Sequence, residues 1–285
     1  MNVSESERLS SGLDQLGYEK VKDADDADIV ILNSCVVRQG AEDKVTSRLD
    51  SLKGHKRKNP DATIALMGSM VGPRTEKLQE RFPHVEYFMR PQEFQSILDF
   101  AAERQGLSCD SDLALLVPEA PKVSTFVPIM QGCDEFCTFC IVPQSRGKSR
   151  SVEPRRIMDE LHRLADQGFQ EIVLTGIHLG GYGADLKSPT NLHRLLNTIE
   201  ESQPAPRIRL SWLDPHEISP ELLRLVAESE TICPHLHIPL QWGNDLVLKR
   251  MRRRYDTSLA RNVLEDVRQA LPDAAIGTDL IVGFH

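Results

Sequence analysis

The chain has 285 residues, 40% of them hydrophobic, and a formal net charge of −8, which fits a globular protein with one large α/β domain or two smaller ones. No apolar run reaches the roughly 18 residues that a membrane span needs, and the opening MNVSESERLS lacks the basic and apolar regions of a secretory signal. Six cysteines are too sparse for a disulfide scaffold. We therefore expect a cytoplasmic protein with no membrane partner.

The first 100 residues alternate between helical and strand patterns. Leu9, Leu13 and Leu16 recur at helical spacing, and two further helical patterns lie around residues 45–52 and 74–81. Short apolar segments typical of buried strands lie at 29–32, 63–67 and 85–88. This alternation predicts a Rossmann-like domain over residues 1–104. The domain opens on a helix where a doubly wound fold opens on a strand, so we expect its first strand to be missing upstream.

A second strand–helix series follows a less periodic stretch. Residues 105–122 contain two prolines and are predicted to form a linker. Beyond it, strands are predicted at 125–129, 171–175, 207–211, 235–240 and 275–282, separated by helices at 154–167, 191–201, 220–228 and 258–271. Regular alternation favours a parallel sheet, and five units suit part of a (β/α) barrel over residues 123–285. The chain ends just beyond a strand, so we expect this barrel to be incomplete at its C-terminal end.

The stretch QGCDEFCTFC places three cysteines, Cys133, Cys137 and Cys140, directly after the first strand of that series. In a reducing compartment such a cluster indicates metal or redox chemistry. Three interpretations stay open: a zinc site completed by a distant histidine, buried structural cysteines, or an iron–sulfur cluster with three protein thiolates and one open iron. The position favours the last, because α/β barrels build their sites at the carboxyl ends of the strands.

The C-x3-C-x2-C spacing, with the aromatic Phe139 before the last cysteine, resembles the radical S-adenosylmethionine (SAM) superfamily. The resemblance implies that Cys133, Cys137 and Cys140 hold a 4Fe–4S cluster whose open iron binds SAM. The cluster passes one electron to SAM, and the resulting 5′-deoxyadenosyl radical abstracts a hydrogen atom. SAM contacts are implied for Phe139, beside the adenine, and for Gly176, Gln241 and Asp279.

Segments along nearly the whole chain resemble the methylthiotransferase family: MNVSESERL, ADIVILNSCVVRQGAEDKV, ALMGSM, EIVLTGIHLGGYGADL, RIRLSWLDPHEI, ICPHLHIPLQWGND and TDLIVGF. Members add a methylthio group to a hypermodified adenosine at tRNA position 37, or, in one branch that fits less well, to a ribosomal protein. The N-terminal segments resemble the MiaB branch, which acts on isopentenyladenosine, and LTGIHLGGYGADL resembles the MtaB branch, which acts on threonylcarbamoyladenosine. The resemblance implies tRNA as partner and an electron donor such as flavodoxin or ferredoxin.

Arg146, Lys148 and Arg150 form a basic run beside the cysteines. By itself such a run is most simply a solvated surface. Given the resemblance, we expect these three side chains to bind RNA phosphates, which adds affinity without reading sequence.

The chain departs from the family at the second, auxiliary 4Fe–4S cluster, which the family holds with three cysteines of the N-terminal domain. Cys35 matches one of them, Ser69 stands at another, and the third belongs to a motif upstream of Met1. A serine hydroxyl is a poor iron ligand, so we expect one cluster rather than two. Cys109 and Cys233 are not placed to compensate. Missing ends suggest a gene that extends at one or both ends.

Several other residues have two interpretations each. Trp212 and Trp242 follow barrel strands and either pack or form a pocket that stacks a base. His235 and His237 alternate on one strand face, as polar packing in the barrel interior or as a metal pair, and His178 and His216 lie in loops after strands. Two rivals to a methylthiotransferase remain: a radical SAM enzyme of altered reaction without the auxiliary cluster, and a non-catalytic RNA- or protein-binding relic.

Overall fold

The computed structural model of the chain describes residues 2–36, 39–91, 93–107 and 123–284. They group into two compact units. We call Asn2–Ala120 with Gln144–Gly147 the N-terminal unit, and Pro121–Pro143 with Lys148–His285 the barrel unit. Most of the predicted linker lies outside the described residues, and so does Cys109. None of the described helices is long and apolar enough to cross a membrane.

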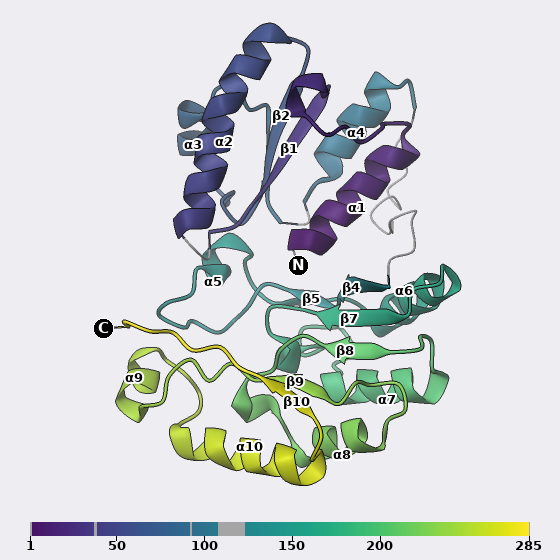
Figure 1. Cartoon of the computed structure of the whole chain (residues 1–285), viewed down its shortest axis with the longest axis vertical. Helices are drawn as coiled ribbons and strands as arrows, with labels where there is room; N and C mark the ends of the chain where they lie inside the picture. Colours follow the sequence, from purple (N-terminus) through teal and green to yellow (C-terminus); the bar gives the residue numbers. More distant parts are fainter. Residues whose placement is uncertain (1, 37–38, 92, 108–122, 285) are drawn as a thin grey trace. The chain divides into compact units, whose positions relative to one another are not determined.

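The N-terminal unit is a parallel sheet with helices on both faces (Figure 1). Its strands, in the spatial order β1-β2-β3, are β1 (Ile29–Ser34), β2 (Thr63–Gly68) and β3 (Tyr87–Met89). Its helices are α1 (Asn2–Gln15), α2 (Gln39–Lys58), α3 (Glu76–Arg81) and α4 (Gln95–Arg104). The Rossmann-like arrangement predicted from the sequence is confirmed, with β1 as an edge strand.

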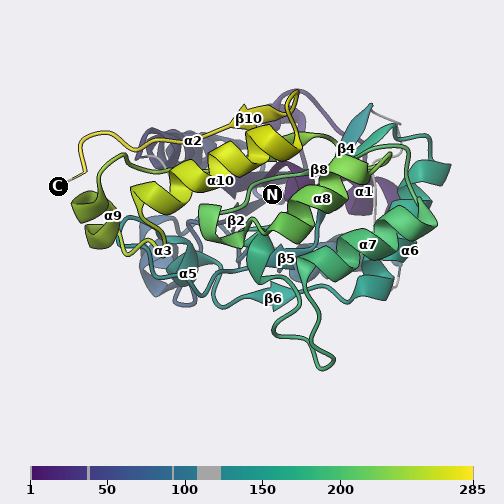
Figure 2. The ribbon, with the colours of Figure 1, turned by 90° about the horizontal axis from the view of Figure 1, so that it is seen from below.

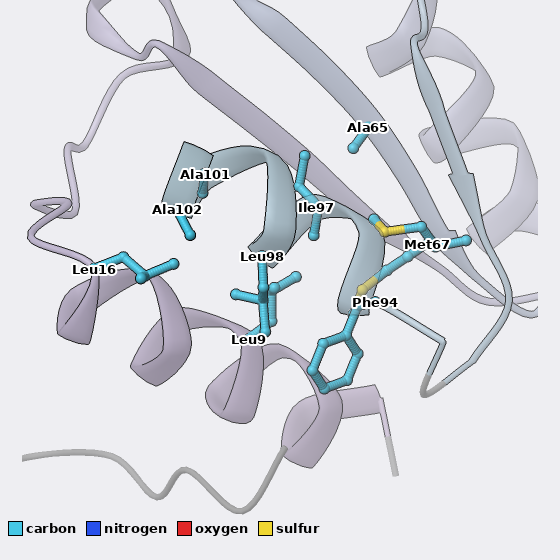
Figure 3. Packing of buried hydrophobic residues seen from close by; sticks show 10 residues of the cluster. Leu9, Leu16, Ala65, Met67, Phe94, Ile97, Leu98, Ala101 and Ala102 are labelled. Atoms are coloured by element: carbon cyan, nitrogen blue, oxygen red, sulfur yellow. The ribbon is translucent and has the colours of Figure 1, made fainter. Parts of the chain in front are cut away.

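Strand β2 is buried along its whole length because both faces of the sheet are covered. Successive side chains of a strand point to opposite faces. Accordingly Ala65 and Met67 pack with α1 and α4, while Ile64 and Leu66 pack with α2. Figure 3 shows Leu9 of α1 meeting the apolar face of α4. Each fully buried Leu or Ile of this kind contributes roughly 1.5–3 kcal/mol from apolar burial.

The barrel unit is a series of parallel strands that alternate with helices. A three-stranded sheet has the order β4-β7-β8, and β9 pairs with β10. An isolated parallel bridge joins Ile208 to Ile232, just before β9. The strands are β4 (Ser124–Pro128), β7 (Glu171–Thr175), β8 (Ile208–Leu210), β9 (His235–His237) and β10 (Ala275–Gly277). The predicted partial (β/α) barrel is confirmed.

The helices of the barrel unit lie in a row along the outside of these strands. Figure 2 shows α7, α8 and α10 side by side, in agreement with the packing of α8 against both neighbours. The main helices are α6 (Pro154–Asp166), α7 (Leu192–Ser202), α8 (Pro220–Glu228) and α10 (Thr257–Ala270). Side-chain caps at Asn191, Ser219 and Asp256 fix where α7, α8 and α10 begin. The loops that carry the candidate site connect the carboxyl ends of the strands to the helices that follow them.

Candidate functional site

The three clustered cysteines share one loop of the barrel unit. The loop runs from β5 (Met130–Gln131) to the short helix α5 (Val142–Ser145), and β5 pairs antiparallel with β6 (Arg150–Ser151). Cys133 and Cys137 are buried, with 7% and 9% exposure, and Cys140 is half-buried. Three thiols in one loop, largely shielded from water, form a soft donor set that suits iron–sulfur clusters.

Each sulfur of the loop receives a hydrogen bond. The backbone N–H of Glu135 donates to Cys133 Sγ at 3.3 Å, and the backbone N–H of Val142 donates to Cys140. The third donor is a side chain, because Arg253 Nη1 lies 3.0 Å from Cys137 Sγ. Hydrogen bonds to sulfur stabilise the thiolate form that binds metal.

Burial outweighs the hydrogen bonds to Cys133 and Cys140 in setting the pKa of these two thiols. It raises the pKa of Cys133 to about 12, against the opposing effect of the Glu135 N–H. Burial also raises the pKa of Cys140. Metal binding must therefore release protons from these thiols.

Arg253 belongs to a buried ion pair beside the loop. Its second terminal nitrogen contacts a carboxylate oxygen of Asp214, and the side chains of Arg253 and Asp214 are 6% and 2% exposed. The guanidinium carbon lies 5.0 Å from the centre of the Tyr255 ring, a cation–π distance. Asp214 also forms a capping box with Glu217 at the following short helix.

A second polar group lies next to the same loop. Ligand atoms of Glu135, His178 and His216 all lie within 4.8 Å of one another. His178 contacts the Glu217 carboxylate through Nε2, and Glu135 also pairs with Arg254 at 3.0 Å. Burial lowers the pKa of His178, but the Glu217 carboxylate and its acidic neighbours outweigh this effect and raise it. Such a cluster can bind a cation or an amine.

Two glycines make room for this group. A Cβ on Gly180 would lie 2.2 Å from the Glu217 carboxyl carbon, and a Cβ on Gly181 would lie 2.7 Å from His178 Nδ1. These glycines therefore let His178 and Glu217 approach each other closely. The loop that contains Gly180 and Gly181 thus positions charged side chains.

The four residues expected to contact SAM occupy three regions of the barrel unit. Phe139 is 37% exposed and packs edge-on against Phe284, with ring centroids 6.5 Å apart. Gly176 is tightly packed, because a Cβ there would lie 2.7 Å from Met130 Cγ. Gln241, with φ of +58°, and Asp279 pair through their backbones beyond β9 and β10, and the Asp279 carboxylate lies 3.0 Å from His237 Nε2.

The three basic residues expected to bind RNA differ in their surroundings. Lys148 and Arg150 are exposed. Arg146 is only 6% exposed, and its guanidinium donates to the Glu5 carboxylate at 2.6 Å and to Asn2 Oδ1 at 2.9 Å. The Arg146 charge is therefore engaged within the N-terminal unit, whereas the side chains of Lys148 and Arg150 are open to solvent.

In the N-terminal unit, the residues expected at the auxiliary cluster lie in a turn that hydrogen bonds stabilise. The Ser69 hydroxyl accepts from the Val36 N–H at 3.1 Å, and the Ser34 hydroxyl donates to the Met67 carbonyl at 2.7 Å and accepts from the Met70 N–H at 3.0 Å. Gly68, with φ of +100°, permits this close turn, since a Cβ there would lie 2.4 Å from the Ser34 carbonyl oxygen. Cys35 is half-buried beside these serines. One thiol with two hydrogen-bonded hydroxyls does not fit a 4Fe–4S cluster.

The remaining candidates lie elsewhere in the barrel unit. Trp242 packs with Leu240 against a small core that includes Tyr255, which favours its packing interpretation, and Trp212 is half-buried. His235 and His237 flank the buried Leu236, as the alternating pattern indicates. Cys233 is buried, with its sulfur 3.8 Å from the Glu171 carboxylate.

Sequence reasoning did not identify Glu135, Asp214, Glu217 and Arg253 as parts of the site. A signal was available for three of them, because Glu135 lies between the cysteines and Asp214 and Glu217 lie in the segment RIRLSWLDPHEI, whereas Arg253 lies outside the segments that carry the resemblance. Arg253 and Asp214 are 39 residues apart, and their pairing depends on the fold.

Comparisons with known proteins cover both units. The model of the Radical SAM superfamily matches residues 127–285, and that of the uncharacterized protein family UPF0004 matches residues 1–90. Similar curated proteins include tRNA-2-methylthio-N(6)-dimethylallyladenosine synthases from Dictyoglomus thermophilum (36% identity, 100% of this chain, 67% of the relative) and Dehalococcoides mccartyi (38% identity, 100% and 65%). The chain thus spans about two thirds of the length of these relatives.

Solved structures give the same fold. The radical S-adenosylmethionine methyltransferase TsrM from Kitasatospora setae, with cobalamin and a 4Fe–4S cluster bound, matches with a TM-score of 0.58 and 16% identity, over 88% of this chain and 57% of that one. The cobalamin-dependent S-adenosylmethionine radical enzyme OxsB matches with a TM-score of 0.58 and 14% identity, over 97% and 42%. At this identity the likeness concerns the fold alone.

Proposed function

The chain belongs to the radical SAM methylthiotransferase family, and from this premise we propose that it is a tRNA methylthiotransferase acting on C2 of the hypermodified adenosine 37. The observation that carries the proposal is the loop of Cys133, Cys137 and Cys140, in which every sulfur accepts an N–H. The relatives' dimethylallyladenosine product favours isopentenyladenosine over threonylcarbamoyladenosine as the substrate.

The donor set of the loop fits one 4Fe–4S cluster held by three thiolates, with SAM on the remaining iron. When bound, the cluster supplies one electron to SAM, which yields the radical that abstracts hydrogen from the substrate. The protein shields this chemistry from water through the burial of Cys133 and Cys137. Its N–H donors favour the ligating thiolate forms.

The polar group of Glu135, His178, His216 and Glu217 is suited to the polar part of SAM. SAM carries a positive sulfonium, and this group has two buried carboxylates, which also pair with His178 and Arg254. His178 Nε2 already contacts the Glu217 carboxylate, but His216 Nδ1 is buried without a hydrogen-bond partner among the described residues, which marks it as a site for a polar ligand. We assign the adenine side to Phe139, and the substrate side to Gln241 and Asp279.

The tRNA contacts and the electron supply complete the proposal. Lys148 and Arg150 are exposed cations that supply phosphate contacts near the cysteine loop. A flavodoxin or ferredoxin would deliver the electron. We place this reaction in the cytoplasm, where tRNA is modified.

A second candidate function is a radical SAM reaction without sulfur insertion. It is favoured by one observation: the Ser69 hydroxyl is engaged with the Val36 N–H at a position where the family uses a cysteine. An enzyme with this site would cleave SAM and would not transfer a methylthio group from an N-terminal cluster.

The test is the tRNA of a deletion strain. Loss of 2-methylthioadenosines on deletion, restored by the natural gene and not by its C133A variant, is the expected result by mass spectrometry of tRNA nucleosides. Unchanged 2-methylthioadenosines in the deletion strain would refute the proposal. Purified protein that forms 5′-deoxyadenosine from SAM without modifying isopentenylated tRNA would favour the second candidate.

A further inference from the structure

Arg253 places a permanent positive charge against one sulfur of the cysteine loop. Its side chain is 6% exposed, and Nη1 lies 3.0 Å from Cys137 Sγ. A guanidinium stays protonated at every accessible pH, unlike a lysine or histidine in the same position. Cys133 and Cys140 receive neutral backbone N–H groups instead, so Cys137 is the cysteine with a charged donor.

The guanidinium is held in place by two neighbours. Asp214, itself 2% exposed, contacts Nη2, and the Tyr255 ring lies below the guanidinium carbon at 5.0 Å. Tyr255 is in turn fixed by its hydroxyl, which donates to the Pro239 carbonyl at 2.9 Å. A planar cation with an anion on one side and a ring on one face has little freedom to turn.

The Arg253–Asp214 pair is neutral in sum, but it is oriented. One terminal nitrogen of the Arg253 guanidinium contacts Cys137 Sγ, and the Asp214 carboxylate contacts the other terminal nitrogen. Arg253 Nε is also buried without a hydrogen-bond partner among the described residues. In a poorly solvated site such an oriented pair acts on nearby charge more strongly than in water.

We infer that Arg253 is a positioning residue that holds Cys137 in its ligating place and raises the reduction potential of the bound cluster. This inference rests on the proposed iron–sulfur function. Reduction adds one negative charge to the cluster, and hydrogen bonds to its sulfurs stabilise the more negative state. Asp214 and Tyr255 act through Arg253 by fixing its orientation.

The test compares variants after anaerobic reconstitution with iron and sulfide. R253Q combined with D214N removes both charges and leaves no unpaired buried ion, and R253K keeps the charge but cannot make the same fork of hydrogen bonds. R252Q is the matched control, because it removes the neighbouring positive charge from an exposed side chain. The midpoint potential of each cluster is measured by EPR-monitored titration without SAM.

We expect the double variant to lower the ratio of reduced to oxidised cluster about tenfold at a given solution potential, equivalent to about 59 mV for one electron. R253K should lie between it and the natural protein, and R252Q should match the natural protein. Equal potentials and EPR spectra in all four proteins would overturn the inference while leaving the proposed function intact. A natural protein that assembles no cluster would instead refute the proposed function, before any variant is compared.

Discussion

The two units each place a cysteine in a turn at the carboxyl end of a parallel strand, and they stabilise these turns differently. In the barrel unit, Cys133 and Cys137 are buried beside an ion pair formed by Arg253 and Asp214. In the N-terminal unit, Cys35 lies beside neutral hydroxyls that hydrogen-bond to the backbone. The first turn has three thiols, one of them beside a charged donor, while the second has one thiol beside two hydroxyls that hydrogen-bond to the backbone.

The difference teaches that the strand end alone does not make a metal site. Both turns have the same topological position, where α/β folds bind ligands. Among the described residues of these two turns, the cysteine loop is the one that has three thiols with N–H donors to their sulfurs. In the other turn the hydroxyls of Ser34 and Ser69 are engaged in hydrogen bonds with the backbone, as in an ordinary structural turn.

The largest effect is expected on iron content, where substitutions of Cys133 and Cys35 should differ. C133A should reduce the iron content of the reconstituted protein from about four per chain to below one and abolish 5′-deoxyadenosine formation, because a cubane cannot be held by two thiolates at this site. C35A should retain about four irons. Iron analysis and chromatography of the SAM cleavage products provide the measurement. Loss of iron in C35A would show that the N-terminal turn takes part in iron binding.

The next effect concerns the buried ion pair. D214A leaves the Arg253 charge buried without its anion, so we expect the barrel unit to be destabilised by about 3–5 kcal/mol. Hydrogen exchange measured by mass spectrometry on peptides of β4 and β7 reports on this unit separately. The exposed D159A on α6 is the control and should change the stability by less than about 0.5 kcal/mol. Equal protection in D214A and D159A would mean that the pair contributes nothing.

A smaller effect is expected in the N-terminal turn. S34A removes a buried hydroxyl that donates to the Met67 carbonyl and accepts from the Met70 N–H, so each of these backbone groups loses one hydrogen bond. We expect a loss of about 1–3 kcal/mol, seen as faster exchange in β1 and β2. S51A, on the exposed surface of α2, removes a hydroxyl that donates to the Arg48 carbonyl and should exchange at the natural rate. No change in S34A would contradict a structural role for the turn.

How far the sequence predicts the molecule depends on the range of the interactions. Local patterns placed the strands well: β7 was predicted at 171–175 and has those bounds, and α8 likewise begins at Pro220 after its Ser219 cap. Strand β9 is shorter than predicted, since it ends at His237 where the chain turns toward Gln241. Helix α4 was not predicted, although Ile97, Leu98 and Ala101 have helical spacing.

The site follows the same division. The cysteines are adjacent in the sequence and were found from their spacing. The partners of Cys137 were not, because Arg253 is 116 residues away and Asp214 is brought to it by the strand β8 loop. The sequence also could not predict that the Arg146 charge is paired, because its partner Glu5 is 141 residues away in the chain. Charges far apart in the sequence become a site only when the fold pairs them.

The last prediction uses pH to distinguish the charged loop from the neutral turn. Burial raises the pKa of Glu217, but its contact with His178 outweighs this and lowers it below the usual 4.5, while the pKa of His178 is raised above 6.5. The stability that Glu217 gains is lost as the pH falls through its lowered pKa. The stability that His178 gains is lost as the pH rises through its raised pKa. The pair therefore stabilises the metal-free barrel unit most between these two values.

H178Q should remove this pH dependence of the stability of the barrel unit. We expect H178Q to lower the free energy of unfolding by less than D214A does. The difference in the free energy of unfolding between the natural protein and H178Q, followed by hydrogen exchange in the barrel unit from pH 4 to 9, should rise to a maximum within the window and fall on both sides. The corresponding difference for S34A, read in the N-terminal unit, should stay constant, because a serine hydroxyl does not titrate in this range. A flat profile for H178Q would mean that its contact with Glu217 is not an ion pair, and the contrast between a charged loop and a neutral turn would then rest on Arg253 and Asp214 alone.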